Sequence, residues 1–115
     1  MAGIVFFKTY QINDLERFYT QELGMEVWLR QADCIILRHE NLLLGFCTRA
    51  EVERSGIITF VYRTRKEVDA LHARLEDVAS GPPAVNEKYK IYHFFGSDPE
   101  HRLLEFQCFL HPVEI

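Results

Sequence analysis

Hydrophobic and polar positions follow first a helical and then a strand period, and this succession occurs twice along the chain. In the first half, Asn13 and Glu16 have the spacing of a capping box and predict a helix start, and Gly24 predicts the helix end. Between them, apolar residues recur at helical spacing: Leu15, Phe18, Tyr19 and Leu23. A strand containing Phe6, Phe7 and Tyr10 is expected before this helix, and three more follow it, over residues 26–30, 34–38 and 42–48.

The second half of the chain repeats this order of elements. After a strand over residues 57–63, Thr64 and Glu67 form a second capping-box pattern, and Gly81 ends the helix that they start. The buried stripe of this helix is expected to contain Val68, Leu71, His72, Leu75 and Val78. Three final strands are expected over residues 85–88, 90–95 and 103–109, which gives the order βαβββ twice.

The last predicted strands of the two halves also match each other. When they are aligned through their Leu-Leu pairs, Gly45 falls opposite Glu105. Chance similarity between short hydrophobic strands is the alternative, but a duplicated module accounts for the match better. We therefore expect a single domain over residues 1–115, with a first module over residues 1–54 and a second over residues 55–115.

The final predicted strand sets one carboxylate, that of Glu105, among apolar neighbours. Because side chains alternate between the two faces of a strand, Glu105 shares its face with Leu103 and Gln107. The other face is apolar and suits packing against a helix; it holds Leu104, Phe106 and Cys108. Glu105 then points toward whatever the sheet encloses. The alternative is an exposed face on which Glu105 meets water.

Composition narrows the classes of function. The chain has 115 residues, of which 48% are hydrophobic and 26% are charged, enough for one ordinary core. Its formal net charge is -4 and its basic residues form no cluster, which argues against nucleic acid or an anionic membrane as a partner. A cationic or neutral small molecule fits this charge better. No apolar stretch approaches the length of a membrane span, and no signal peptide is expected.

The cysteines bear on the cellular compartment. Cys34, Cys47 and Cys108 are odd in number and lack CxxC spacing, so they are expected to be reduced, buried small hydrophobes. Reduced cysteines are typical of the cytosol, and we therefore expect a cytoplasmic protein.

Three segments give the chain a resemblance to a known family. They are FYTQELG at residues 18–24, FFGSDPE at residues 94–100 and LEFQ at residues 104–107. With the paired modules, they resemble the vicinal oxygen chelate superfamily, which contains glyoxalase I, extradiol dioxygenases and the fosfomycin- and bleomycin-resistance proteins. The resemblance implies an α+β fold in which two βαβββ modules form a cupped, eight-stranded mixed sheet, with the helices on its outer face. It also implies a ligand in the concave face and a second subunit that completes the cup.

The metal site of the superfamily is not expected here. Its metal-dependent members use a His or Gln on the first strand, a His or Glu in the other module and a Glu on the last strand, and Glu105 matches only the last. The other positions fall on Ile4, Phe6 or Phe7 in the first strand and on Ile57, Ile58 or Thr59 in the fifth. One carboxylate cannot hold a catalytic zinc or iron ion, which needs about three protein ligands. We therefore expect no metal and no cofactor.

His93 is the histidine that could act with Glu105. It lies on the preceding strand and could serve as a second ligand or as an acid/base partner, so the candidate catalytic residues are Glu105 and His93. The alternative is that Tyr92 and Phe94 face the cup and that His93 meets solvent. His72, on the helix stripe, is expected to pack between helix and sheet.

The turn before the last strand departs from the superfamily pattern Asp-Pro-Asp-Gly. Glu100 and His101 stand where Asp and Gly would be. Glycine suits such a position because the turn needs a positive φ, which a histidine adopts only at some cost. We expect the turn to form, with His101 at positive φ.

The sequence leads to two candidate functions and to a third interpretation in which no ligand is bound. The first is a metal-free, bleomycin-resistance-like protein that binds a cationic or aromatic small molecule in an acidic, aromatic cup. The second is a metal-dependent lyase, isomerase or dioxygenase with Glu105 as ligand or base. The third is a dimeric domain whose cup is filled by its own side chains. In each case we expect a homodimer, because a single pair of modules leaves sheet edges uncovered.

Overall fold

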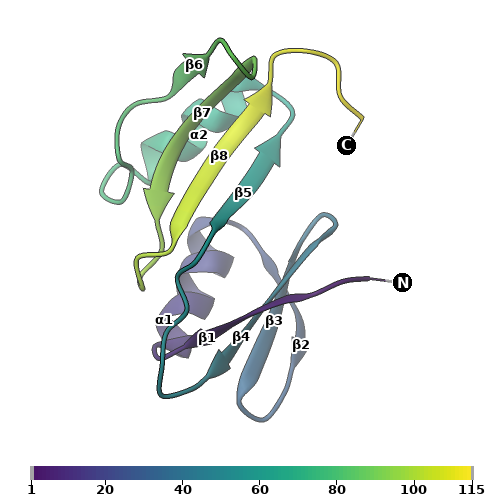
Figure 1. Cartoon of the computed structure of the whole chain (residues 1–115), viewed down its shortest axis with the longest axis vertical. Coiled ribbons are helices and arrows are strands. Elements are labelled where there is room, and N and C mark those ends of the chain that lie inside the picture. The colour runs from purple at the N-terminus through teal and green to yellow at the C-terminus, as the bar shows by residue number, and fades with distance from the viewer. Residues whose placement is uncertain (1, 115) are drawn as a thin grey trace. The chain divides into compact units, whose positions relative to one another are not determined.

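The computed structural model describes residues 2–114 and divides into two compact units. Unit 1 comprises residues 1–55 and 99–101, and unit 2 comprises residues 56–98 and 102–115. Each unit holds one four-stranded mixed sheet, so the eight expected strands are divided between two sheets. The fold is α+β, with a βαβββ order of elements in each unit (Figure 1).

Unit 1 builds its sheet in the order β1-β4-β3-β2, and only β1 and β4 are parallel. Its helix α1 continues into a wider π-helical turn, η1, before the chain returns to the sheet. The elements are β1 (Val5–Thr9), α1 (Ile12–Arg17), η1 (Phe18–Glu22), β2 (Glu26–Arg30), β3 (Cys34–His39) and β4 (Leu42–Thr48). In the core of this unit the rings of Tyr19 and Phe46, both fully buried, lie 5.1 Å apart.

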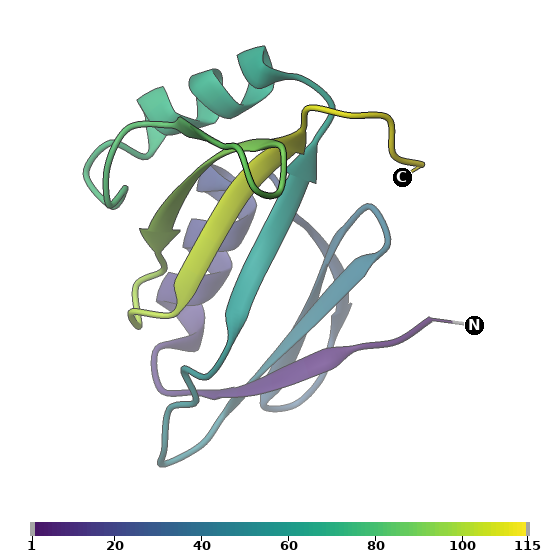
Figure 2. The ribbon, with the colours of Figure 1, turned by 45° about the horizontal axis from the view of Figure 1, so that its top comes forward.

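Unit 2 repeats the arrangement in the order β5-β8-β7-β6, with β5 and β8 parallel. Helix α2 lies along one face of the sheet, above β5, β7 and β8 in Figure 2. The elements are β5 (Ile57–Tyr62), α2 (Arg65–Arg74), β6 (Ala84–Asn86), β7 (Ile91–Ser97) and β8 (Leu103–Phe109). Under the helix, Phe106 stacks on Phe94 at 4.9 Å and on Phe60 at 5.7 Å between ring centroids.

Strand register makes the two units equivalent residue by residue. Phe6 is the partner of Gly45 across β1 and β4, and Thr59 is the partner of Glu105 across β5 and β8. Because Leu44 and Leu104 occupy the preceding register positions, Gly45 and Glu105 are counterparts, as the alignment of the two last strands predicts.

The two predicted capping boxes have different outcomes. Thr64 caps α2 as expected, because its hydroxyl oxygen accepts a hydrogen bond from the backbone N–H of Glu67 at 3.1 Å. The capping box at Asn13 is wrong: α1 begins after Gln11, and no side chain at that cap position bonds the helix. Instead, the carboxylate of Glu100, which lies far away in the sequence, binds the start of the helix. It accepts a hydrogen bond from the backbone N–H of Gln11 at 2.9 Å.

The structure also tests the expected packing of His72 and the expected place of Tyr10 in the first strand. His72 packs between helix and sheet as predicted: its ring meets the Phe94 ring edge-on at 5.0 Å between centroids, and its Nε2 lies 3.1 Å from the carbonyl oxygen of Gly81. Tyr10 lies outside the strand in which it was expected, because β1 ends at Thr9 and the chain turns there toward α1.

The cysteine prediction is wrong for two of the three residues. Cys34 and Cys47 form a disulfide between β3 and β4, where the two residues are direct partners in the antiparallel ladder. Proximity in sequence gives no hint of this pairing, because it depends on strand register. Cys108 is free and buried, as expected. Among the described residues no helix is long and apolar enough to span a membrane.

The turn at residues 98–101 has the expected backbone conformation, since His101 has a φ of 68°. We therefore expect His101→Gly to stabilise the protein by up to about 1 kcal/mol, because relief of the strained φ outweighs the added entropy of the unfolded chain. Urea unfolding measures this effect. The matched control Ala70→Gly, at an exposed site inside α2, should cost about 0.5–1 kcal/mol. An equal loss at both positions would contradict the turn.

Candidate functional site

A polar cluster of Thr59, His93 and Glu105 lies on the face of the unit 2 sheet opposite α2. The three residues come from three neighbouring strands of the sheet, β5, β8 and β7. Their positions follow from strand alternation, because the intervening residues point to α2: Leu104 and Phe106 are fully buried there. The prediction that Glu105 lies opposite the helix-covered apolar face is therefore confirmed.

The cluster is a short hydrogen-bond network centred on the carboxyl group of Glu105. As a carboxylate, Glu105 only accepts hydrogen bonds, so Thr59 and His93 are the donors. Thr59 Oγ1 lies 2.9 Å from Oε1, and His93 Nδ1 lies 2.6 Å from Oε2. The side chains of His93 and Glu105 retain 15% and 14% of their exposure, so the pair is mostly desolvated but reachable. Nε2 of His93 remains as the ring nitrogen that can meet a ligand.

The orientation of β7 settles which of its residues face away from α2. His93 lies opposite Gln107 and Phe95 lies opposite Glu105, so both share the face of the cluster. The alternative, with Tyr92 and Phe94 on that face, is wrong. Phe94 is buried against α2, and the hydroxyl of Tyr92 donates to Asp69 of that helix.

The cluster has apolar neighbours, with Gln107 as a polar one on the same face. The ring of Phe95 meets the His93 ring edge-on at 5.1 Å between centroids. Ile57 and Leu103, which are direct partners at the other end of the same face, are exposed. A polar centre among exposed apolar side chains is the usual composition of a small-molecule site.

The donors of this cluster do not fit the superfamily metal. Among the described residues no group of three or more His, Cys, Asp or Glu side chains is arranged so that it could hold a metal ion. The position beside Glu105 on β5 holds Thr59. The counterparts of Thr59 and Glu105 within unit 1 are Phe6 and Gly45, and neither carries a ligand group. A transition-metal site needs about three protein ligands of nitrogen, sulfur or carboxylate type, and here only the imidazole and one carboxylate are available.

The equivalent face of unit 1 carries an aromatic ring and a glycine at the positions of Thr59 and Glu105. The Phe6 ring lies over Gly45, and a Cβ at residue 45 would stand only 2.3 Å from two ring carbons, so glycine is required there. Register places Cys34 and Cys47 at the counterparts of His93 and Gln107. This face bears a hollow of about 370 Å³, lined by Phe6, Phe7, Lys8, Gln31, Cys34, Cys47, Arg49 and Glu53.

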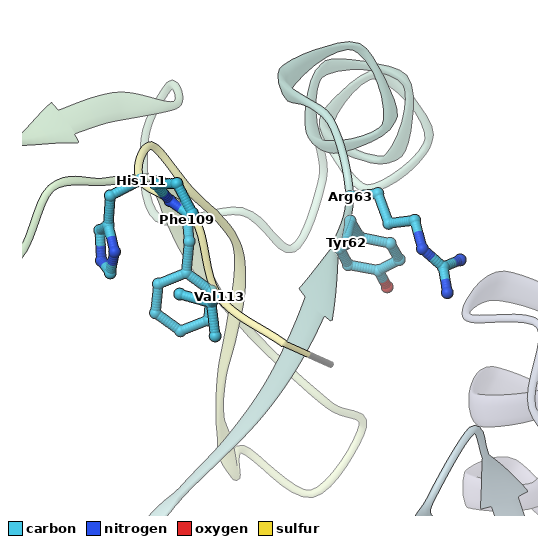
Figure 3. Close-up of a pocket in the computed structure, with 6 residues that line it drawn as sticks. Tyr62, Arg63, Phe109, His111 and Val113 are labelled. Atoms are coloured by element: carbon cyan, nitrogen blue, oxygen red, sulfur yellow. The ribbon is translucent and has the colours of Figure 1, made fainter.

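Unit 2 has a hollow of its own, which no sequence signal predicts. It measures about 290 Å³ and lies where β5 and β8 end, between Tyr62, Arg63, Phe109, His111, Pro112 and Val113 (Figure 3). Phe109 and Val113 form one side, and the Arg63 side chain points away from them. Burial raises the pKa of Tyr62 far above its usual value, with a further contribution from the negative charge of Glu67. Its hydroxyl is therefore a neutral group at physiological pH.

Solved structures resemble the chain over nearly its whole length. A glyoxalase/bleomycin resistance protein/dioxygenase family enzyme from Burkholderia phytofirmans superposes with a TM-score of 0.80 at 18% identity, over 91% of this chain and 95% of that one. A glyoxalase/bleomycin resistance protein/dioxygenase from Nocardioides gives 0.77 at 16% identity, over 100% and 89%. A lactoylglutathione lyase from Agrobacterium tumefaciens gives 0.76 at 16% identity, over 94% and 92%.

These likenesses lie in structure rather than in sequence. No protein-family model and no curated protein matches the chain. Identities of 16–18% establish the fold alone, and they confirm at that level the resemblance indicated by the helix end, the Asp-Pro turn and the final strand. The chain has the glyoxalase/bleomycin resistance protein/dioxygenase fold, which is that of the vicinal oxygen chelate superfamily.

Proposed function

We propose that the protein binds a small molecule at the Thr59–His93–Glu105 cluster and that it does so without a resident metal. The observation that carries this proposal is the mostly desolvated carboxylate of Glu105, held by two donors on a sheet face that also carries exposed apolar side chains. A carboxylate in such surroundings attracts a cation or a hydrogen-bond donor more strongly than it would in water.

The apolar neighbours define the rest of the ligand. Phe95 and the exposed side chains of Ile57 and Leu103 offer contact surface to a planar or aromatic group. An organic cation with a flat ring system therefore fits the proposal best, because its charge would meet Glu105 and its ring would lie on the apolar side chains. The net charge of the chain, -4, favours the same class of ligand.

A second candidate function is enzymatic. The 2.6 Å contact between His93 Nδ1 and Glu105 Oε2 is within the range for proton transfer, and a carboxylate that orients an imidazole is a common acid/base pair. In this reading the pair acts on a bound substrate as a lyase or isomerase would, with Glu105 as base. A role for Glu105 as a metal ligand has less support, because its partner on β5 is Thr59 rather than a histidine or a carboxylate.

We also propose that the chain forms a homodimer. The edge strand β2 exposes Val27, Trp28 and Leu29 together, an apolar edge that monomeric proteins usually cover. Sedimentation at micromolar concentration should give twice the chain mass of 13.6 kDa. A monomer under these conditions contradicts the proposal.

A thermal-shift panel tests the binding function. The panel contains planar organic cations, such as ethidium and acriflavine, beside neutral and anionic aromatics of similar size. At a concentration one hundred times its Kd, a ligand stabilises the fold by about 2.7 kcal/mol, which should raise Tm by roughly 10 °C in a domain of this size. We expect the cations to give the largest shifts.

The variant Glu105→Gln keeps the shape of the side chain and removes its charge. It should fold normally and lose most of the shift caused by cations, while Glu87→Gln, at an exposed loop residue, should retain it. Equal shifts in both variants would place the cation elsewhere. A preference for anions over cations would contradict the proposed ligand class.

A further inference from the structure

The disulfide between Cys34 and Cys47 lies on the wall of the unit 1 hollow. The two residues are direct partners in β3 and β4, and 13 positions separate them in the sequence. Both sulfur-bearing side chains line the hollow, whose volume of about 370 Å³ admits a small molecule. Cys34 is half-buried and Cys47 is 9% exposed, so Cys34 is the sulfur that an incoming group meets first.

Backbone pairing joins the strands β3 and β4 in addition to this bond. From Ile35 with Phe46 to His39 with Leu42, the β3 and β4 residues pair without interruption. Beside the disulfide, the ladder continues through a 2.9 Å bond from the N–H of Thr48 to the carbonyl oxygen of Asp33. The ladder would therefore keep two reduced cysteines opposite each other, ready to pair again.

The third cysteine is not accessible in the same way. Cys108 is 1% exposed, and burial raises the pKa of its thiol, which disfavours the thiolate that takes part in exchange. At the wall of the hollow, the guanidinium of Arg49 is paired at 2.7 Å with the carboxylate of Asp33, the residue next to Cys34, so this pair brings no net charge to the disulfide.

We propose that Cys34 and Cys47 form a reversible redox site that exchanges with low-molecular-weight thiols through the hollow. The thiolate of the incoming thiol attacks Sγ of Cys34, the S–S bond breaks, and Cys47 leaves with the electron pair and takes up a proton. A second thiol then attacks the mixed disulfide and releases the Cys34 thiol. Two thiols are oxidised to one disulfide while the protein disulfide is reduced to two thiols. This site is independent of the Glu105 cluster.

Alkylation followed by mass measurement of the intact chain tests the proposal. The protein is purified without reductant, treated with dithiothreitol in the absence of denaturant, and then alkylated in denaturant. We expect one alkyl group per chain before reduction and three after it, with an unchanged far-UV spectrum in the reduced state. Removal of dithiothreitol and addition of oxidised glutathione should restore the value of one. Three groups from the start, or reduction only in denaturant, would overturn the proposal.

Single variants test the order of attack. With oxidised glutathione, Cys47→Ser should gain one glutathione mass at Cys34, while Cys34→Ser should remain unmodified over the same time. Cys108→Ser should behave as the parent chain does, apart from one alkyl group fewer. Modification of Cys47 as fast as that of Cys34 would overturn the assignment of Cys34 as the attacked sulfur.

Discussion

Replacing Glu100 by alanine is expected to lower the free energy of unfolding by about 3–5 kcal/mol, because one buried and two part-buried donors lose their acceptor together. Glu100 is 4% exposed and accepts from Thr9 Oγ1 at 2.6 Å and from the N–H groups of Tyr10 and Gln11 at 2.8 and 2.9 Å. The hydroxyl of Thr9 is fully buried, so water cannot replace the carboxylate there. Urea unfolding at neutral pH measures the loss.

Two further variants separate the carboxylate from the side-chain volume. Glu100→Gln keeps one acceptor oxygen but brings an NH2 group against donors, so its loss should be smaller than that of Glu100→Ala yet clearly measurable. Glu87→Ala, at an exposed loop position, should change stability by no more than about 0.5 kcal/mol. A loss below about 1 kcal/mol for Glu100→Ala would mean that the start of α1 does not depend on this residue.

The buried ion pair of unit 2 should give an effect of similar size. Arg102 and Asp98 are 2% and 3% exposed, and Arg102 Nη1 lies 3.2 Å from Asp98 Oδ2. The backbone N–H of Arg102 also donates to Asp98 Oδ1 at 3.0 Å. Arg102→Ala leaves the carboxylate buried without its cation, and such a change typically costs about 3–5 kcal/mol.

A double-mutant cycle shows whether that loss comes from the unpaired charge. Asp98→Asn combined with Arg102→Ala should be more stable than the sum of the single losses predicts, because no uncompensated charge remains. Lys66→Ala, at an exposed position in α2, is the control for removal of a cation. Additive losses in the double variant would contradict a direct interaction between the two side chains.

Features fixed by local sequence could be predicted from the sequence alone. The alternation of Leu104, Glu105 and Phe106 determines which side of β8 faces the helix, and burial of the apolar pair decides the direction. The Thr64 cap likewise depends only on neighbouring residues. The positive φ of His101 was expected from the turn pattern of the superfamily, and the sheet architecture from the resemblance to it. Strand alternation was sufficient for the side of β8 on which Glu105 lies.

Features fixed by contacts between distant residues could not be predicted. The side on which His93 lies depends on the register of β7 against β8, and the pattern of β7, aromatic on both faces, permits either orientation. The disulfide likewise requires the register of β3 against β4. The partner of the α1 start, Glu100, is 89 positions from Gln11, beyond any local pattern.

The metal content of the chain, purified without added metal or chelator, tests most directly whether the Glu105 cluster works without a resident ion. Inductively coupled plasma mass spectrometry gives the ratio of each divalent metal to protein. Because the cluster offers one imidazole and one carboxylate, we predict ratios well below one for zinc, manganese, iron and nickel, with no difference between the parent chain and Glu105→Ala. A stoichiometric amount of any of these metals, lost in Glu105→Ala, would contradict the account.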